Sequence, residues 1–322
     1  MLSRVADASF WMSRYIERAE ANSRVLDVNI QLMLDFEHMN GGTAQQHWQP
    51  ILATLEDQEL FTELHDGITG DAVMDFVTFE KSYSNSIVSC ISHARENARM
   101  VREQISSEMW EHINRLYLYL HSESSRAAFI ESPIDFYRSL VDSLHSFHGI
   151  TDATMTHGEG WQFLRAGKFL ERADSTSRVL DIKYHILLPS GEQVGGTVDS
   201  TQWMAVLRSC SAMEAFLKIS HGHVLGWEVA QFLILHDTFP RSLRFCTDQL
   251  DEALHCISGC DRVHFSNDAE RLSGMLRSNL DYATIQPIFA EGLHQFLDRT
   301  QLSLIEISDA LVKTYCTWLD RS

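Results

Sequence analysis

The segment Glu17-Arg18-Ala19-Glu20-Ala21-Asn22-Ser23-Arg24-Val25-Leu26-Asp27 returns, slightly changed, as Glu171-Arg172-Ala173-Asp174-Ser175-Thr176-Ser177-Arg178-Val179-Leu180-Asp181. Eight of the eleven positions are identical, at an offset of 154 residues. Apolar residues around the first copy recur every three or four positions, as at Met12, Ala19 and Leu26, which predicts an amphipathic helix. A second copy of the same helix indicates that the chain is built from two related halves.

The same register continues on both sides of this segment. Matched positions of the two halves are Gly41-Gly42-Thr43 with Gly195-Gly196-Thr197, Trp48 with Trp203, Ser86 with Ser242, and Cys90 with Cys246, the last three pairs after short slips. We therefore predict a tandem duplication, with a first repeat over residues 1–155 and a second over 156–322.

The composition favours an all-α protein. The chain has only 5 prolines and 16 glycines among 322 residues, about half of their usual combined share of about 12%. Because these residues interrupt helices, their scarcity predicts long helical stretches. The expected fold is a helical bundle of about ten to twelve helices with no sheet.

Charge and patterning exclude several functional classes. Acidic residues number 44 and basic residues 26, which gives a net charge of −18 at pH 7. Such a chain repels nucleic-acid phosphates and anionic membrane surfaces. No apolar run approaches the roughly 20 residues of a membrane span, and the first ten residues lack a secretory signal. Six cysteines in a chain of this length predict reduced thiols and a cytoplasmic protein.

The repeated helix carries charges as well as an apolar face. Glu20 with Arg24, and Asp174 with Arg178, are pairs in the favourable i,i+4 order. We expect the two helices to pack near the pseudo-twofold axis, with each Glu-Arg pair meeting the other. The predicted ion network comprises Glu17, Arg18, Arg24, Glu171, Arg172 and Arg178. Two alternatives stay open: a solvated, salt-bridged face, and a surface for a ligand or partner.

The duplicated Glu-Arg-Ala motif resembles the alpha-E family, a bacterial helical domain named for its ER motif and typically present in tandem. Further segments that carry the resemblance are Leu2–Asp7, Ala94–Arg99, Ser106–Trp110, Gly149–Asp152 and Gly160-Trp161. It spans essentially the whole chain, although the second half has no clean equivalent of Ala94–Arg99.

The resemblance implies a function without an established enzymatic activity. Members are associated with circularly permuted ATP-grasp carboxylate–amine ligases, a transglutaminase-like protein and an NTN-hydrolase-type peptidase. It therefore implies a non-catalytic helical partner or scaffold in a peptide synthesis or modification system, with protein partners and no cofactor. One alternative is an enzyme that handles a peptide through Glu17, Glu171, Arg24 and Arg178 in a cleft between the repeats.

A second alternative is a metal-dependent helical-bundle enzyme. The candidate ligands are two Glu-x-x-His pairs, Glu252 with His255 and Glu291 with His294, and a stripe of Cys256, Cys260 and His264 if that stretch is helical. Two such Glu-x-x-His pairs are close to the number expected by chance, and structural zinc usually uses a tighter cysteine knuckle. We therefore expect no bound metal.

The densest basic stripe is the candidate anion or partner surface. Arg95, Arg99 and Arg102 share one face of the predicted helix. Three guanidinium groups on one stripe could hold a carboxylate, a phosphate or an acidic peptide. The alternative is a solvated face paired with Glu96 and Glu103. No phosphate-binding loop or nucleophile elbow is present, and Cys90 and Cys246 are predicted to be core residues.

Overall fold

The computed structural model describes residues 1–38, 48–52, 58–186, 197–220 and 222–316, and these residues form helices and no strand. The helices are α1 (Ser3–His38), α3 (Gln58–Leu64), α4 (Gly70–Phe79), α5 (Ile87–Met100), α6 (Ser107–Leu120), α7 (Glu123–Glu131), α8 (Pro133–Thr154), α9 (Glu159–Ile186), α10 (Thr197–Ser209), α11 (Met213–Leu217), α12 (Gly226–Leu235), α13 (Leu243–Ser258), α14 (Asp268–Asp281), α15 (Ile285–Glu291), α16 (Leu293–Leu311) and a π-helical turn, η1 (Val312–Cys316). Residues 48–52 are also helical. The all-α prediction is confirmed.

The described residues form more helices than the ten to twelve expected, because several of the helices are short. Helices α3, α7, α11 and α15 have only five to nine residues each and occupy stretches that connect longer helices. Of the two glycine-rich breaks, residues 41–43 and 195–196 lie outside the described part of the chain. Within that part, no helix is both long and apolar enough to cross a membrane.

Local sequence explains where many helices begin. Side chains that accept a hydrogen bond from a backbone N–H of the first turn are those of Thr69, Ser86, Ser106, Ser122, Ser132, Ser242 and Asn267. Each satisfies a donor that the helix itself leaves without a partner. Ser86 and Ser242, matched between the two halves in the sequence, therefore occupy equivalent capping positions at the starts of α5 and α13.

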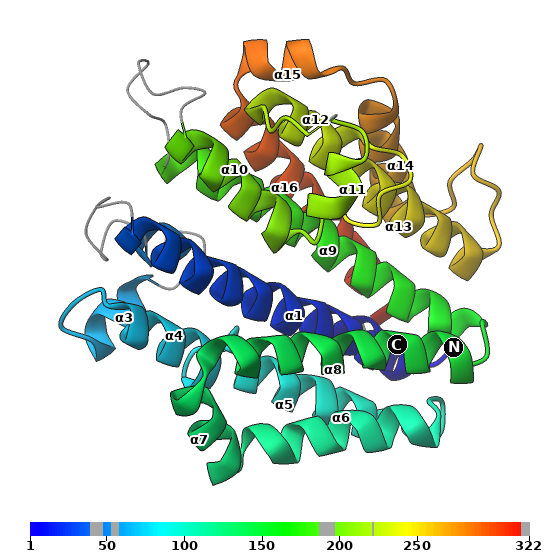
Figure 1. The fold of residues 1–322 in the computed structure, drawn as a ribbon. Coiled ribbons are helices and arrows are strands. Elements are labelled where there is room, and N and C mark those ends of the chain that lie inside the picture. The colour runs from blue at the N-terminus through cyan, green and yellow to red at the C-terminus, as the bar shows by residue number, and fades with distance from the viewer. Residues whose placement is uncertain (39–47, 53–57, 187–196, 221, 317–322) are drawn as a thin grey trace.

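Helices α1 and α9 form the centre of the molecule. They lie side by side in Figure 1, with α3–α8 below them and α10–α16 above. The amino group of Met1 lies 3.0 Å from the Glu159 carboxylate, so the two helices start together and run in the same direction. Each helix contributes to both apolar cores: Phe10 of α1 packs in the core of the second half, and Leu164 of α9 in that of the first.

A glycine allows the two central helices to approach closely. A Cβ atom at Gly167 of α9 would lie 2.3 Å from the backbone carbonyl oxygen of Phe10 in α1. No side chain larger than hydrogen fits that contact. The close approach brings the charged positions of the two helices, one to two turns further along, within hydrogen-bonding distance.

Candidate functional site

Two reciprocal Glu–Arg pairs join α1 to α9. Arg172 donates to both carboxylate oxygens of Glu17, at 2.6 and 2.8 Å. Arg18 donates in the same way to Glu171, at 2.5 and 3.0 Å. The exposed fractions of the Glu17 and Glu171 side chains are 0% and 2%. The structure therefore brings the two ER motifs together as a buried, doubly bidentate pair.

Other charged residues extend this pair into the ER network. Arg14 donates to Glu171 at 2.8 Å, and Arg178 donates to Asp174 at 2.7 Å. Arg24 donates to Glu20 within α1. The network then contains the arginines 14, 18, 24, 172, 178 and 241, and the carboxylates Glu17, Glu20, Glu171 and Asp174. Both residues of each ER motif therefore form ion pairs within the protein.

Arg241 is a member that the sequence did not suggest. It precedes α13 and donates to Glu17 at 3.0 Å and to Glu20 at 2.6 Å. Its match in the first half is Asn85, which lies directly before Ser86 and accepts a hydrogen bond from Arg18 at 2.5 Å. Each residue directly precedes a matched capping serine, so the repeat aligns the two positions without indicating that either one reaches the ER network.

The pKa shifts show how burial and charge compete in the ER network. Burial raises the pKa of Glu171, but the charges of Arg18 and Arg14 outweigh it and lower the pKa to about 2. Burial is likewise outweighed at Glu17 by Arg172 and Arg241, and at Glu20 by Arg241 and Arg24, so both pKa values lie below their usual range. These carboxylates remain ionised at neutral pH.

Two neighbours respond mainly to burial. Burial lowers the pKa of His148, whose Nε2 lies 3.2 Å from a Glu17 oxygen, so the ring is neutral at pH 7. Burial also raises the pKa of the Asp174 carboxyl, against the opposing charge of Arg178. Neither group is placed as an acid or base facing an open cavity.

The melting temperature is expected to fall as the pH is lowered from about 7 to about 3. Below pH 6.5 the unfolded chain binds a proton at His148 that the native protein does not. Between pH 4.5 and about 2, protonation of Glu171 removes the stability that its ionised form provides. Asp174 acts in the opposite direction, because its pKa is raised in the native protein.

Thermal melts across this pH range test the expectation, with Glu171→Gln as the matched variant. Its melting temperature should depend less steeply on pH between about 4.5 and 3, since the titrating carboxyl is gone. Equal slopes for the wild-type protein and the variant would show that the arginine contacts do not lower the pKa of Glu171 in the native protein.

The ER network leaves little room for a substrate or a metal ion. A small cavity of about 70 Å³ lies between α1 and α9, lined mainly by apolar residues such as Val25, Leu26 and Val179. Glu17, Glu20 and His148 come close enough together to hold a cation, but Arg172 and Arg241 already occupy the two carboxylates. A cation there would meet two guanidinium groups at short range.

The predicted stripe of Arg95, Arg99 and Arg102 is not a continuous helix face. Helix α5 ends at Met100, so Arg102 lies in the following turn. The guanidinium carbons of Arg95 and Arg102 lie 5.6 and 5.1 Å from the centre of the Trp110 ring. Arg99 is 65% exposed and pairs with Glu96. Arg95 and Arg102 therefore gather around Trp110, and Arg99 is joined to Arg95 through Glu96, with which both pair. These three arginines, which do not form a straight stripe, are the arginine cluster at Trp110.

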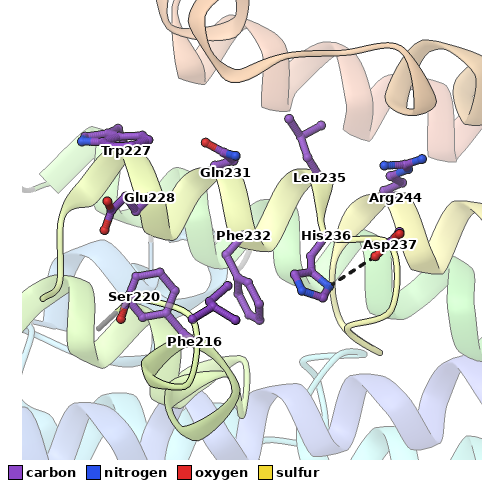
Figure 2. Close-up of a pocket in the computed structure, with 11 residues that line it drawn as sticks. Phe216, Ser220, Trp227, Glu228, Gln231, Phe232, Leu235, His236, Asp237 and Arg244 are labelled. Atoms are coloured by element: carbon purple, nitrogen blue, oxygen red, sulfur yellow. Dashed lines mark ion pairs between the residues drawn. The ribbon is translucent and has the colours of Figure 1, made fainter. Parts of the chain in front are cut away.

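Sequence patterns gave no sign of a pocket of about 430 Å³ at α11, α12 and the start of α13. Figure 2 shows Phe216 and Phe232 on its lower side and Glu228 projecting toward them from α12. Glu228 Oε2 is buried without a hydrogen-bond partner. Such a pocket has the size for a small ligand, and Glu228 would accept a hydrogen bond from a ligand bound there. It was missed because short, separate helices supply its walls.

In the structure, the candidate metal ligands have partners other than those that the sequence spacing suggested. Glu252 pairs with Arg165, Glu291 with Arg299, and His294 with Asp181, so neither Glu-x-x-His pair forms a shared site. The candidate stripe of Cys256, Cys260 and His264 does not form, because α13 ends at Ser258 and Gly259 adopts a left-handed conformation with φ of 77°. His264 is exposed beside Asp261. Cys260 instead comes close to His255 and Glu270.

Comparison with known proteins agrees with this picture of an all-helical protein centred on the ER residues. Residues 1–316 match the family model named Alpha-E, described as "a predicted alpha-helical domain with a conserved ER motif". The chain belongs to the Alpha-E family. It is 21% identical over 334 aligned residues to uncharacterised proteins of Mycobacterium bovis and of Mycobacterium tuberculosis.

These matches cover different shares of this chain and of the mycobacterial proteins. They cover 97% of this chain but only 36% of each mycobacterial protein. The chain thus spans about a third of the length of those relatives. No solved structure matches the chain.

Proposed function

We propose that the protein is a non-catalytic helical partner or scaffold in a peptide synthesis or modification system. Its proposed partners are an ATP-grasp carboxylate–amine ligase and a transglutaminase-like protein. The observation that carries the proposal is the internal position of the ER network. The residues by which the family is described serve to join α1 to α9. Glu17, Glu171 and Arg172 are buried, Arg172 of α9 donates to Glu17 of α1, and Arg18 of α1 donates to Glu171 of α9.

The alternative of a peptide-handling enzyme centred on the same residues receives less support. Catalysis by Glu17 or Glu171 needs a carboxylate that can reach a substrate. Both carboxylates accept bidentate hydrogen bonds from arginines, and the neighbouring cavity of about 70 Å³ is too small for a peptide. A partner surface on the outside of the molecule is therefore the better candidate for function.

We also propose that the chain arose by duplication, with repeats over 1–155 and 156–322. Corresponding helices follow in the same order and have matching neighbours: α5 packs on α1, α4 and α6, as α13 packs on α9, α12 and α14. Trp48 lies over Gly70 as Trp203 lies over Gly226. The contrast between the halves then points to surfaces that only one repeat carries, such as the arginine cluster at Trp110.

The arginine cluster at Trp110 is the proposed contact with the acidic face of a partner. Arg99 and Arg102 are exposed, whereas Arg95 stacks on Tyr117 at 4.5 Å and donates to Asn114. Reversing the two exposed charges leaves the Arg95 contacts in place. Like charges brought together at an interface cost several kcal/mol.

Affinity purification from the native cell tests both the partner and the surface. The wild-type protein should retain an ATP-grasp ligase or transglutaminase-like protein in a near-stoichiometric amount. Arg99→Glu/Arg102→Glu should retain at least roughly tenfold less, while Arg4→Glu/Arg208→Glu, the same charge change at exposed positions elsewhere, should not. Equal recovery by both variants would exclude the cluster, and a wild-type protein without either partner would refute the proposed function.

A further inference from the structure

Three potential metal ligands converge where α13 ends and α14 begins. His255 lies in the last turn of α13, Cys260 just beyond its capping Gly259, and Glu270 in the first turn of α14. Their ligand atoms all lie within 4.8 Å of one another, and His255 Nδ1 is 3.9 Å from Glu270 Oε2. Ligands around a tetrahedral zinc ion, with bonds of about 2.0–2.3 Å, lie about 3.3–3.8 Å apart. Side-chain shifts of about 1 Å would close this geometry.

The His255 ring is oriented as a metal ligand. It is 6% exposed, and its buried Nδ1 has no hydrogen-bond partner. Its other nitrogen, Nε2, lies 3.6 Å from Asp251 Oδ1. Asp251 is itself fixed by Ser273 at 2.8 Å and by Arg262 at 2.9 Å. A carboxylate behind the second ring nitrogen is the usual support for a metal-bound histidine.

Glu270 is held in place before any metal arrives. Its side chain accepts hydrogen bonds from the Ser266 backbone N–H at 2.6 Å and from Asn267 at 2.7 Å, and Asn267 caps α14 in return. Cys260 is partly exposed, so the group is accessible from solvent. A thiolate, a carboxylate and a neutral imidazole together balance the charge of a divalent ion.

We propose that His255, Cys260 and Glu270 form a zinc-binding site. The combination of nitrogen, sulfur and oxygen ligands suits Zn²⁺, and three protein ligands leave a fourth position for water or for a group from a partner. Binding displaces the thiol proton of Cys260 to solvent and links α13 to α14. This site departs from the expectation of no metal and stands independently of the proposed scaffold function.

Cobalt titration of chelator-treated protein tests the site. Cobalt bound to a thiolate gives a charge-transfer absorption in the near ultraviolet, and this band should saturate at one cobalt per chain and disappear on addition of zinc. Cys260→Ser should abolish the band and lower zinc affinity by more than roughly 100-fold, since even the loss of an outer-shell partner costs 10–100-fold. Cys256→Ser is the matched control, an exposed cysteine one helical turn earlier, and should behave as the wild-type protein.

A second variant separates loss of a ligand from loss of the fold. Glu270→Gln keeps an oxygen that can accept from Ser266 while removing the carboxylate charge, so it should weaken zinc binding with an unchanged helical circular dichroism spectrum. A wild-type protein that binds no cobalt would overturn the proposal. So would a band that survives Cys260→Ser, because the metal would then lie elsewhere.

Discussion

Glu17→Ala is expected to lower the free energy of unfolding by about 3–5 kcal/mol. The variant leaves Arg172 and Arg241 buried without the carboxylate that they share. Arg172 then keeps only a long hydrogen bond to the Pro240 carbonyl, at 3.5 Å, among its polar contacts in the described structure. Urea denaturation followed by circular dichroism measures the change.

A double-mutant cycle tests the contact directly. Arg172→Ala should cost a similar amount, but Glu17→Ala/Arg172→Ala should cost about 2–3 kcal/mol less than the sum of the single variants. Glu291→Ala supplies the matched control, because Glu291 also accepts two hydrogen bonds from one arginine, Arg299, but at an exposed site. That variant should cost at most about 1 kcal/mol. Additive costs for Glu17 and Arg172 would contradict a direct pair.

The pairing of the ER motifs of α1 and α9 could be predicted from the sequence because the motif occurs twice in the chain. A charged helix face is ordinarily solvated, but a repeated Glu-Arg order on two related helices is self-complementary when the helices run side by side. Nothing local to either copy indicates Arg241, which reaches the ER network from the start of α13. Such a residue is found only when the packing of α13 on α9 is known.

The ends of α13 and α5 show that local sequence predicts some helix ends and not others. Gly259 ends α13 through a left-handed conformation, a signal that glycine provides. Helix α5 ends at Met100 with no glycine or proline before Ser106, the residue that caps α6. Helices α5 and α6 pack against each other, so the chain turns between them, and Arg102 lies in that turn and not on the helix face.

The sequence named His255 and Cys260 as candidate metal ligands, but their combination with Glu270 in the proposed zinc site could not be predicted from it. Sequence spacing pairs a histidine with ligands on its own helix, which suggested Glu252 for His255 and the two nearby cysteines for His264. The fold instead selects Glu270 from the next helix, because α13 packs on α14 and the intervening loop returns Cys260 toward His255. A ligand set formed across a helix–helix contact carries no periodic signature.

Gly167→Ala is expected to destabilise the protein by about 3 kcal/mol, the upper part of the range for overpacked cores. The added methyl group would meet the Phe10 carbonyl at 2.3 Å, and a backbone atom inside a helix cannot move aside as a side chain can. Gly149→Ala is the matched control within α8, where a Cβ meets nothing within 4 Å. It should stabilise the protein by about 0.5–1 kcal/mol, since alanine favours a helix over glycine.

The two substitutions at the α1–α9 contact are also expected to depend on each other. If Gly167→Ala forces the helices apart, it lengthens the bidentate contact between Glu17 and Arg172 further along the same interface. Part of its cost then comes from that ion pair, so it should cost less when Glu17→Ala is already present. Full additivity between Gly167→Ala and Glu17→Ala would mean that the close approach and the ER network stabilise the interface separately. Urea denaturation of the two single variants and the double variant distinguishes these outcomes.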